Sequence, residues 1–368
     1  MYGNRSVALI AAMLLLLLAA CSEQSPAPPN VAATPQPAKP IVLKLAETWG
    51  PNYPIFGDAT QKLATLVEQM SAGRLRITID SANKHKAPFG VLDMVKAGQY
   101  DIGHSASYYW KGKDPNTLYF TSMPFSLTAP EQLAWFYYGG GIDLMQKVYA
   151  KHGVLSFPGG NTGNQMGGWF RKEINSVEDL QGLKMRIPGF AGEVLAKLGA
   201  KPTNIAPGEL YTALERNTID ALEWVGPSLD LRMGFHKIAP YYYTGWHEPG
   251  TELQFIVNQK TWDGLPDDLR TILRTAMQAV AFDMYARAFH DSAENWAAMK
   301  REYPDIQVKT FPNEVLVALK RANDELLAEF AAADPVAKEV IDSLASYQAK
   351  ARGWTAISDQ AYLNSMPD

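Results

Sequence analysis

The stretch SVEDLQGLKMRIPG, residues 176–189, predicts a short helix, then a strand, then a tight turn. Ser176 is of the residue type that caps helices, and Asp179 adds negative charge to the expected first turn. Residues 183–187 carry the apolar and branched side chains of a strand, which we expect to end at the Pro-Gly pair that closes the stretch. Because the sequence becomes helical again after this turn, the stretch indicates an α/β fold.

The same alternation of strands and helices continues on both sides. Strands are expected at residues 41–48, 75–79, 100–103, 154–157, 219–224 and 253–257. Helices are expected at residues 57–70, 90–98, 192–198, 207–216 and 266–303, and within 315–347. This order predicts open α/β sheets, and 368 residues are enough for two domains. The helix at 266–303, about 57 Å long at ~1.5 Å per residue, could lie across both.

The first forty residues carry export signals. An apolar run at 7–18 is too short to span a bilayer, which needs about 20 residues, but it suits a secretory signal peptide over 1–20. The run ends in LAAC, which resembles the lipobox of bacterial lipoproteins. We therefore expect Cys21, the only cysteine, to carry a lipid that anchors a periplasmic protein to a bacterial membrane. An ordinary signal peptide with an incidental cysteine is the alternative. Residues 21–40, rich in Pro and Ala, predict an extended tether.

Composition and motifs argue against several classes of protein. The net charge is -4 and no basic stripe is present, so nucleic acid is not an expected partner. A single cysteine excludes a disulfide within the chain and a multi-cysteine metal site. The six histidines lack the spacing of a helical zinc site, and no G-x-S-x-G elbow, Walker loop or Rossmann fingerprint occurs. These absences lower the expectation of an enzyme, and no histidine is placed to act as a general base.

Polar groups at strand ends are the first candidates for a ligand site, because open α/β sheets bind ligands beyond the carboxyl ends of their strands. Arg186 ends the strand at 183–187, and its guanidinium suits a carboxylate; a surface salt bridge is the alternative. Glu223 and Trp224 end the strand at 219–224, where a buried carboxylate needs a cation, a metal or a proton. The alternative there is a Glu–Arg ion pair packed under a core tryptophan.

Two loops add further candidates. Asn161 and Gln165 lie in the glycine-rich passage at 159–169, where the backbone can approach a ligand closely; a turn between domains is the alternative. Tyr108 and Tyr109 lie in an aromatic loop, and such rings line small-molecule clefts as well as cores.

Four phrases of the sequence resemble the extracytoplasmic solute-binding subunits of TRAP transporters, the DctP-like family. They are DIGHSASYYW (101–110), NSVEDLQGLKMRIPG (175–189), ELYTALERNTIDALEWVGP (209–227) and ELQFIVN (252–258). Three more look like the TakP-like subgroup, whose members bind 2-oxo acids with a metal cation: GNTGNQMGGWF (160–170), EWVGP (223–227) and YYYTGWHEPG (241–250). The resemblance extends over residues 42–357.

The resemblance implies a site for a carboxylate and a cation. Arg186 would grip the carboxylate of the ligand. The cation would be surrounded by Gln165, Glu223, Glu248 and the main-chain carbonyl of Trp224. Further ligand contacts would come from Ser105, Tyr108, Tyr109, Asn161, Gln165 and Trp224. An all-oxygen donor set suits a hard cation such as sodium or calcium.

The resemblance also implies an architecture and a function. The fold would be a two-domain periplasmic binding protein-like α/β fold with a hinge and long C-terminal helices. The first domain would hold 41–160 and 226–258, and the second 161–225 and 259–368. The protein would capture a small monocarboxylate, a 2-oxo or 2-hydroxy acid, and deliver it to a TRAP-type permease. A homodimer formed by exchange of the C-terminal helices is also implied; a long helix that packs within its own chain is the alternative.

Two alternatives from other classes remain at this point. One is a metal-dependent lyase or aldolase that acts on pyruvate at the same cation site. The other is a ligand-sensing lipoprotein that signals to a membrane receptor.

Overall fold

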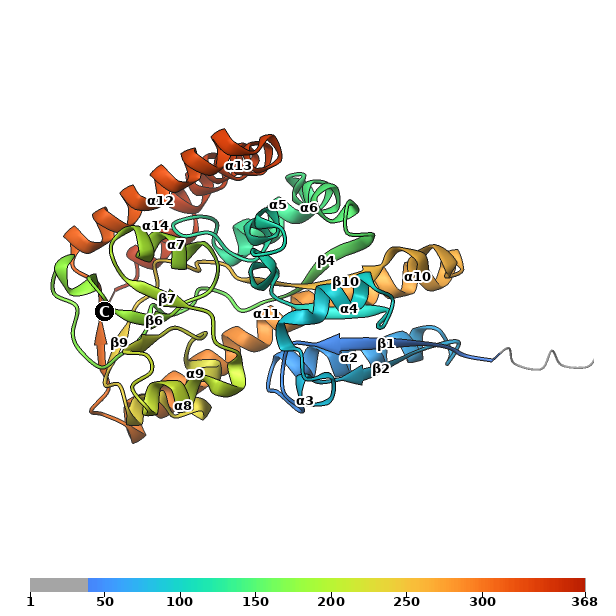
Figure 1. The fold of residues 1–368 in the computed structure, drawn as a ribbon, viewed down its shortest axis with the longest axis horizontal. Helices are drawn as coiled ribbons and strands as arrows, with labels where there is room; N and C mark the ends of the chain where they lie inside the picture. Colours follow the sequence, from blue (N-terminus) through green and yellow to red (C-terminus); the bar gives the residue numbers. More distant parts are fainter. Residues whose placement is uncertain (1–38, 368) are drawn as a thin grey trace, which may run out of the picture. The chain divides into compact units, whose positions relative to one another are not determined.

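The computed structural model describes residues 39–367, which form two α/β lobes (Figure 1). The first lobe is built on a five-stranded sheet in the order β2-β1-β3-β10-β4. Its strands are β1 (Ile41–Glu47), β2 (Leu75–Asp80), β3 (Ile102–Ser105), β4 (Val154–Asn161) and β10 (Glu252–Asn258). Strand β1 is parallel to β2 and β3, whereas β10 is antiparallel to both of its neighbours. Every residue of β10 is buried, as expected for a strand with partners on both sides.

The second lobe is built on a six-stranded sheet in the order β11-β9-β5-β8-β6-β7. Its strands are β5 (Gly168–Phe170), β6 (Lys184–Arg186), β7 (Lys201–Thr203), β8 (Ala221–Leu222), β9 (Tyr241–Tyr243) and β11 (Gln307–Lys309). Strands β6, β7 and β8 are parallel to one another, so their carboxyl ends meet at one edge of the sheet. That edge carries Arg186 at the end of β6 and Glu223 just beyond β8.

Helices cover both sheets. They are α2 (Phe56–Met70), α3 (Ala82–His85), α4 (Val91–Lys96), α5 (Ala129–Tyr138), α6 (Gly141–Ala150), α7 (Gly189–Lys197), α8 (Leu210–Glu215), α9 (Pro227–Met233), α10 (Gln259–Gly264), α11 (Asp267–Glu302), α12 (Asn313–Ala333), α13 (Pro335–Ile357) and α14 (Asp359–Asn364). Among the described residues, no helix is both long and apolar enough to cross a membrane.

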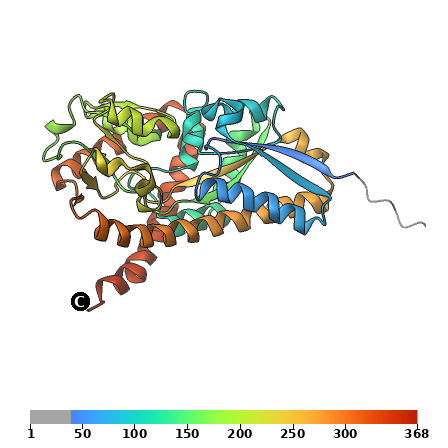
Figure 2. The ribbon, with the colours of Figure 1, turned by 90° about the horizontal axis from the view of Figure 1, so that it is seen from below.

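Helix α11 belongs to both lobes. It packs on α2 and β4 of the first lobe and on α9 of the second, and it runs along both in Figure 2. Its 36 residues correspond to about 54 Å at ~1.5 Å per residue. The prediction of one long helix across two domains is confirmed.

The chain also crosses between the sheets in two loops, at 162–167 and 244–251. These loops touch so closely that a Cβ added to Gly245 would lie 1.9 Å from the carbonyl oxygen of Gln165. A side chain at Gly245 would therefore push the two crossings apart.

The strand pairing bears on where the domains divide. The stretch 226–258 contributes β9 to the second sheet and β10 to the first, while α10 packs on β10. The boundaries 41–160 with 226–258, and 161–225 with 259–368, stay a prediction. The pairing favours moving 226–243 to the second domain.

Most of the predicted elements are found, and the structure adds short ones that were not predicted: β5, β7, β9, β11, α3, α9, α10 and α14. There are three further differences. Helices α5 and α6 fill residues 129–150, for which no helix was predicted, and α5 begins with a capping box of Thr128 and Glu131. Ser176 does not cap a helix. Instead, the Asp179 carboxylate accepts hydrogen bonds from the backbone N–H groups of Asn175 and Ser176, at 2.8 and 3.1 Å. The strand expected at 219–224 is limited to β8, so Glu223 and Trp224 lie in the loop after it. The signal peptide, Cys21 and most of the tether lie outside the described residues.

Candidate functional site

The carboxyl edge of the second sheet brings a buried ion pair to the boundary with the first lobe. Arg186 and Glu223 are fully buried, and the guanidinium Nη1 contacts the Glu223 carboxylate. The same Nη1 donates a hydrogen bond to the Glu223 carbonyl at 2.8 Å, and Nη2 lies 3.4 Å from the Tyr109 hydroxyl of the first lobe. The guanidinium also lies over the Trp224 ring, 5.3 Å from its centroid.

Arg186 keeps its positive charge in this pair. Burial, the largest single influence, would by itself lower the pKa of Arg186, but the Glu223 carboxylate and the other neighbouring groups together outweigh it, so the pKa is raised. Of the two alternatives left open by the sequence, a surface salt bridge is wrong for Arg186, because no part of it is exposed. The ion pair of Glu223 with an arginine beside a tryptophan is present. A buried pair of this kind is weak evidence for stability alone, because desolvation offsets much of the attraction.

A second acidic group lies beside the pair. Glu223, His247 and Glu248 each offer one ligand atom, and these atoms lie within 4.8 Å of one another. His247 Nε2 lies 3.3 Å from Glu223, and Glu248 accepts a hydrogen bond from the Thr251 hydroxyl at 2.9 Å. Burial, followed by the charge of Glu223, raises the pKa of Glu248 to about 7. Two buried carboxylates this close favour a cation between them.

Two residues next to this cluster, Gln165 and Trp224, each carry an oxygen atom without a partner among the described residues. The Gln165 side chain is buried, and its amide nitrogen donates to the Thr162 hydroxyl at 2.9 Å. Its oxygen Oε1 has no partner among the described residues. The Trp224 carbonyl likewise accepts no hydrogen bond from the described part of the chain. Gln165 is held next to Glu248 because its own N–H donates to the Glu248 carbonyl at 2.9 Å.

Aromatic side chains from both lobes enclose the space beside these groups. A small cavity there is lined by Trp49, Phe56, Tyr108, Tyr109, Thr162, Gln165, Trp224, Val225, Thr251 and Leu253. In this conformation it has room for about one water molecule. Trp49 is held by a hydrogen bond from its Nε1 to His104 Nδ1 at 2.9 Å. Because that nitrogen accepts, the His104 Nε2 proton donates to the Gly159 carbonyl at 3.0 Å.

The structure thus brings together most of the predicted site residues. Arg186, Glu223, Trp224, Gln165, Glu248, Tyr108 and Tyr109 lie around the ion pair or the cavity. Ser105 and Asn161 do not line the cavity. The Ser105 hydroxyl shares a hydrogen bond with Thr48 at 2.6 Å. Asn161 donates to Gln132 and Glu252, and its oxygen accepts from the N–H of Gly163, so its groups support the crossing loop.

His247 and Trp49 are site residues that the sequence reasoning missed. His247 lacks the spacing of a helical metal site, although it adjoins Glu248 in the phrase GWHEPG. Its Nε2 faces Glu223 while Nδ1 has no partner among the described residues. Nothing in the local pattern around Trp49 distinguishes it from a core tryptophan.

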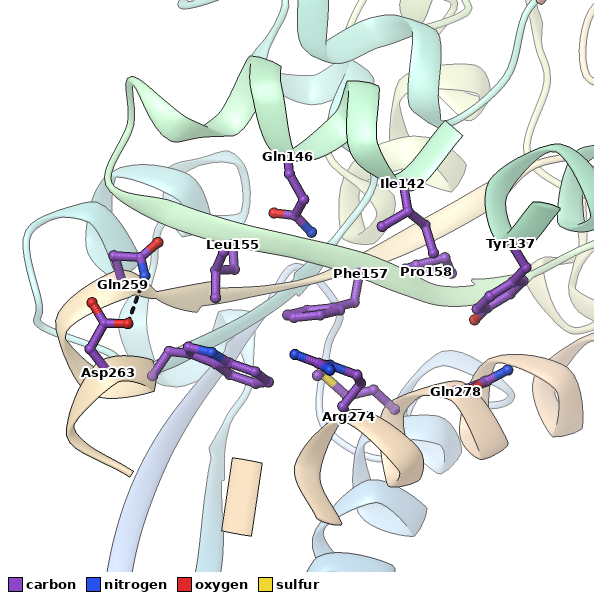
Figure 3. A pocket seen from close by; sticks show the side chains of 12 residues that line it. Tyr137, Ile142, Gln146, Leu155, Phe157, Pro158, Gln259, Asp263, Arg274 and Gln278 are labelled. Atoms are coloured by element: carbon purple, nitrogen blue, oxygen red, sulfur yellow. Dashed lines mark hydrogen bonds between the residues drawn. The ribbon is translucent and has the colours of Figure 1, made fainter. Parts of the chain in front are cut away.

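A larger hollow lies elsewhere on the first lobe and has a different character. Figure 3 shows it between β4, α6, α10 and α11, with Leu155, Phe157 and Pro158 along its floor. Its volume is about 450 Å³, and the Arg274 guanidinium lies over the Trp262 ring at its edge. Its lining holds one carboxylate, Asp263, and no cluster of ligating groups. The ion pair and its surroundings are therefore the better candidate for a small anionic ligand.

Comparison with known proteins gives consistent results. The sequence profile of the DctP family, described as bacterial extracellular solute-binding protein family 7, matches residues 45–334. A monocarboxylate 2-oxoacid-binding periplasmic protein of Nostoc sp. is 38% identical over 322 residues, which are 87% of this chain and 88% of that protein.

Two solved structures are closer in sequence. A TRAP periplasmic solute-binding protein from Colwellia psychrerythraea, with bound calcium and pyruvate, is 68% identical with a TM-score of 0.89. One from Pseudoalteromonas atlantica T6c, with bound sodium and pyruvate, is 66% identical with a TM-score of 0.89. Each match covers 89% of this chain and 100% of the other. The predicted fold, two α/β domains with long C-terminal helices, is confirmed.

Proposed function

This chain belongs to family 7 of the bacterial extracellular solute-binding proteins, and on that premise we propose that it binds a short 2-oxo acid, with pyruvate as the representative, together with a hard metal cation. The family consists of periplasmic binding proteins that serve transport, so the alternative of a lyase or aldolase is not carried forward. The relatives that hold pyruvate with calcium or sodium support the choice of ligand and cation.

The observation that carries the proposal is the convergence of one guanidinium and several oxygen donors at one buried place. Arg186 supplies a buried guanidinium group, whose N–H donors can bind both oxygens of a carboxylate. Glu223, Glu248, the unpartnered Gln165 oxygen and the Trp224 carbonyl supply oxygens. An anion recognised by arginine alone would not need two carboxylates beside it, whereas an anion bound together with a cation does.

The donor set fits a hard cation. Sodium and calcium prefer carboxylate and carbonyl oxygens, and the four proposed donors are of these types. When bound, the cation would offset the negative charge of Glu223 and Glu248 and offer positive charge to the oxygens of the ligand. His247, which lies beside Glu223, provides a nitrogen that these cations do not prefer, so we assign it to holding Glu223 in place.

The remaining contacts of the ligand follow from the cavity. Tyr108, Tyr109 and Trp224 would surround it on the aromatic side, with Trp49 and Phe56 beyond them. Ser105 and Asn161 would support the site without contacting the ligand, because the polar groups of each already have partners in the protein. The small size of the space favours short 2-oxo or 2-hydroxy acids over long ones.

Admission of the ligand requires the lobes to separate. Arg186 and Glu223 have no exposed surface, and residues of both lobes close over them. The two crossing loops and α11 are the connections about which the lobes would move. Contacts that the ligand makes only when the lobes are closed would shift the population toward the closed form. We propose that this closed form docks on a TRAP-type membrane permease.

The first experiment is calorimetry of the purified mature protein with pyruvate, after removal of metal ions by chelation. Binding is expected on addition of calcium or sodium and is expected to be weak without them. Propionate, which has the carboxylate but lacks the 2-oxo oxygen, is the matched control ligand and should bind far more weakly. Equal binding of propionate would contradict the role of the cation. No binding of pyruvate or larger 2-oxo acids with either cation would overturn the proposed function.

Attachment to the membrane is a separate part of the proposal. Cys21 would carry the lipid, and residues 22–40 would tether the lobes to the membrane. Mass spectrometry of the mature N-terminal peptide should find an acylated cysteine, and Cys21→Ala should move the protein from the membrane fraction to the soluble fraction. Wild-type protein in the soluble fraction with an unmodified Cys21 would contradict the anchor.

We also propose that two copies associate through their C-terminal helices. Helix α14 packs on α13 and projects away from the lobes in Figure 2. Trp354, Ile357 and Leu363 are 68%, 75% and 68% exposed, which is unusual for large apolar side chains that lie so close together in sequence. Light scattering at two concentrations should give a dimer, and removal of residues 358–368 should weaken it. A monomer at both concentrations would refute this part.

A sensing role is the remaining alternative for the same binding site. It differs only in the partner, a signalling receptor in place of a permease. Uptake of labelled pyruvate by cells, lost on deletion of this chain and restored by its return, would support transport. Unchanged uptake on deletion would favour sensing.

A further inference from the structure

Asp230, on α9, is a buried carboxylate that touches none of the proposed ligand-binding atoms. It is 1% exposed, and four donors converge on it. The N–H groups of Val225 and Gly226 reach Oδ1, each at 3.1 Å. Trp169 Nε1 and the Tyr242 hydroxyl reach Oδ2, at 3.0 and 2.9 Å. One oxygen therefore holds the loop after β8, and the other holds side chains of β5 and β9.

The contact with Val225 fixes the direction of the Trp224 carbonyl. The carbonyl of Trp224 and the N–H of Val225 belong to one peptide unit, and no cis peptide bond occurs in the described part of the chain. In a planar trans peptide these two groups point in opposite directions. Because the N–H points at Asp230, the carbonyl points away from it. That carbonyl accepts no hydrogen bond from the described residues, so nothing else holds its direction.

The neighbouring backbone groups are held as well. The Val225 carbonyl accepts from the N–H of Met166 at 2.9 Å, which ties this loop to the one that carries Gln165. The N–H of Glu223 donates to the Arg186 carbonyl at 3.1 Å. The loop is thus fixed before and after Trp224. Two peptide units lie between these points: Arg186 holds the first through the Glu223 carbonyl, and Asp230 holds the second.

The four hydrogen-bond donors around Asp230 are matched best by an ionised carboxylate. An ionised carboxylate accepts at both oxygens, whereas an amide or a protonated acid has a hydrogen on one of them. Burial raises the pKa of Asp230 to about 7, and the four donors act in the opposite direction. Such a charge in a buried place needs a reason beyond packing, because an apolar residue would avoid its desolvation cost.

We propose that Asp230 is a positioning residue of the ligand site, which aims the Trp224 carbonyl at the bound cation by holding the Val225 N–H. This inference rests on the proposed function, since it assigns a purpose to that carbonyl. It parallels the general behaviour of metal sites, in which partners of the ligating groups tune affinity without touching the ion.

The test separates the two oxygens of Asp230. Asp230→Ala removes the contacts on both sides, whereas Tyr242→Phe removes one donor on the Oδ2 side and leaves the loop contacts intact. Three quantities are measured for each: the melting temperature, the calcium affinity by calorimetry at saturating pyruvate, and the rates of amide hydrogen exchange at Val225 and Gly226 without ligand. Asp230→Asn serves as the second variant if the alanine variant does not fold.

For Asp230→Ala we expect calcium affinity to fall about 10- to 100-fold. Exchange at Val225 and Gly226 should accelerate about tenfold or more, because their acceptor is lost. Tyr242→Phe should lower the melting temperature while its calcium affinity stays within about threefold of wild type. Asp230→Asn cannot accept hydrogen bonds from all four donors, so its calcium affinity should lie between those of Asp230→Ala and Tyr242→Phe.

Two results would overturn the inference. One is wild-type calcium affinity in Asp230→Ala. The other is a loss of affinity in both variants that simply follows the loss in melting temperature. Failure of the wild type to bind pyruvate with calcium would instead overturn the proposed function. In that case the exchange rates still report whether Asp230 holds the peptide, so the two failures are distinguishable.

Discussion

Replacing Arg186 by methionine removes the guanidinium but keeps much of the side-chain volume, so it tests recognition and stability separately. In the proposed complex the guanidinium forms two charge-assisted hydrogen bonds with the ligand carboxylate. Bonds of this kind contribute about 1.5–3 kcal/mol each, so about 3–6 kcal/mol of binding free energy should be lost. At ~1.4 kcal/mol per tenfold, the dissociation constant for pyruvate should rise about 10²- to 10⁴-fold.

The same change should destabilise the fold through Glu223. Without Arg186, the fully buried Glu223 carboxylate loses its cationic partner and keeps Glu248 as a neighbour. Breaking a buried pair from one side costs about 3–5 kcal/mol, whereas replacing both partners by apolar residues is often nearly neutral. The double variant Arg186→Met with Glu223→Met should therefore regain most of the free energy of unfolding but none of the affinity.

The assays are urea denaturation for stability and calorimetry with calcium and pyruvate for affinity. The matched control is Lys184→Met, two residues earlier on β6, where the lysine forms an exposed pair with Asp220 at 3.6 Å. That variant should change stability by no more than about 1 kcal/mol and leave the affinity unchanged. The reasoning fails if the Arg186 variant binds pyruvate within about threefold of wild type. It also fails if the double variant is no more stable than the single one.

Three further predictions concern other groups. Gln165→Leu removes the unpartnered buried oxygen, so calcium affinity should fall about tenfold or more at saturating pyruvate; an unchanged calcium titration would contradict its role. Burial raises the pKa of Glu47 from 4.5 to about 7, so the folded protein binds this proton more tightly, and stability should fall by about 3 kcal/mol between pH 4.5 and 7. Glu47→Gln should remove that loss. In urea denaturation, the free energy of unfolding of the variant should therefore rise relative to that of wild type from pH 5 to pH 8; a constant difference would refute the assignment. Gly160→Ala should lower the free energy of unfolding by about 2–5 kcal/mol, since φ is 131° and the new Cβ would lie 2.1 Å from Met284 Sδ. The control Gly98→Ala, at φ 72°, meets no atom within 4 Å and should lower it by about 1–2 kcal/mol. Similar losses for both variants in chemical denaturation would contradict the clash.

The sequence predicts well what depends on local pattern. The strand at 253–257 and the helix at 266–303 are found almost at their predicted bounds, as β10 and α11, because each has a long and regular apolar pattern. Arg186 and Glu223 could be chosen as candidates because both follow directly on apolar strand segments. Strand order in a sheet then brings their side chains together, although they are far apart in the chain.

The sequence predicts poorly what depends on distant partners. Asn161 is buried and polar, as expected of a binding residue, but its groups are taken by Gln132, Glu252 and backbone N–H groups that no local pattern indicates. Asp230 is the opposite case, a residue that the sequence does not mark as a candidate. Its four donors come from two strands and a loop, and none of them is next to it in the chain. Helices α5 and α6 were not predicted, although α5 carries the capping box that marks a helix start.

Helix α11 and the two crossing loops also determine how the molecule unfolds. A domain that shares a 36-residue helix with its neighbour cannot lose its own core without exposing the apolar face of that helix to water. The two halves should therefore melt in a single calorimetric transition, despite having separate sheets. In the periplasm, proteases would then meet either the whole folded chain or the whole unfolded one. A ligand held between the halves would protect both from degradation at once.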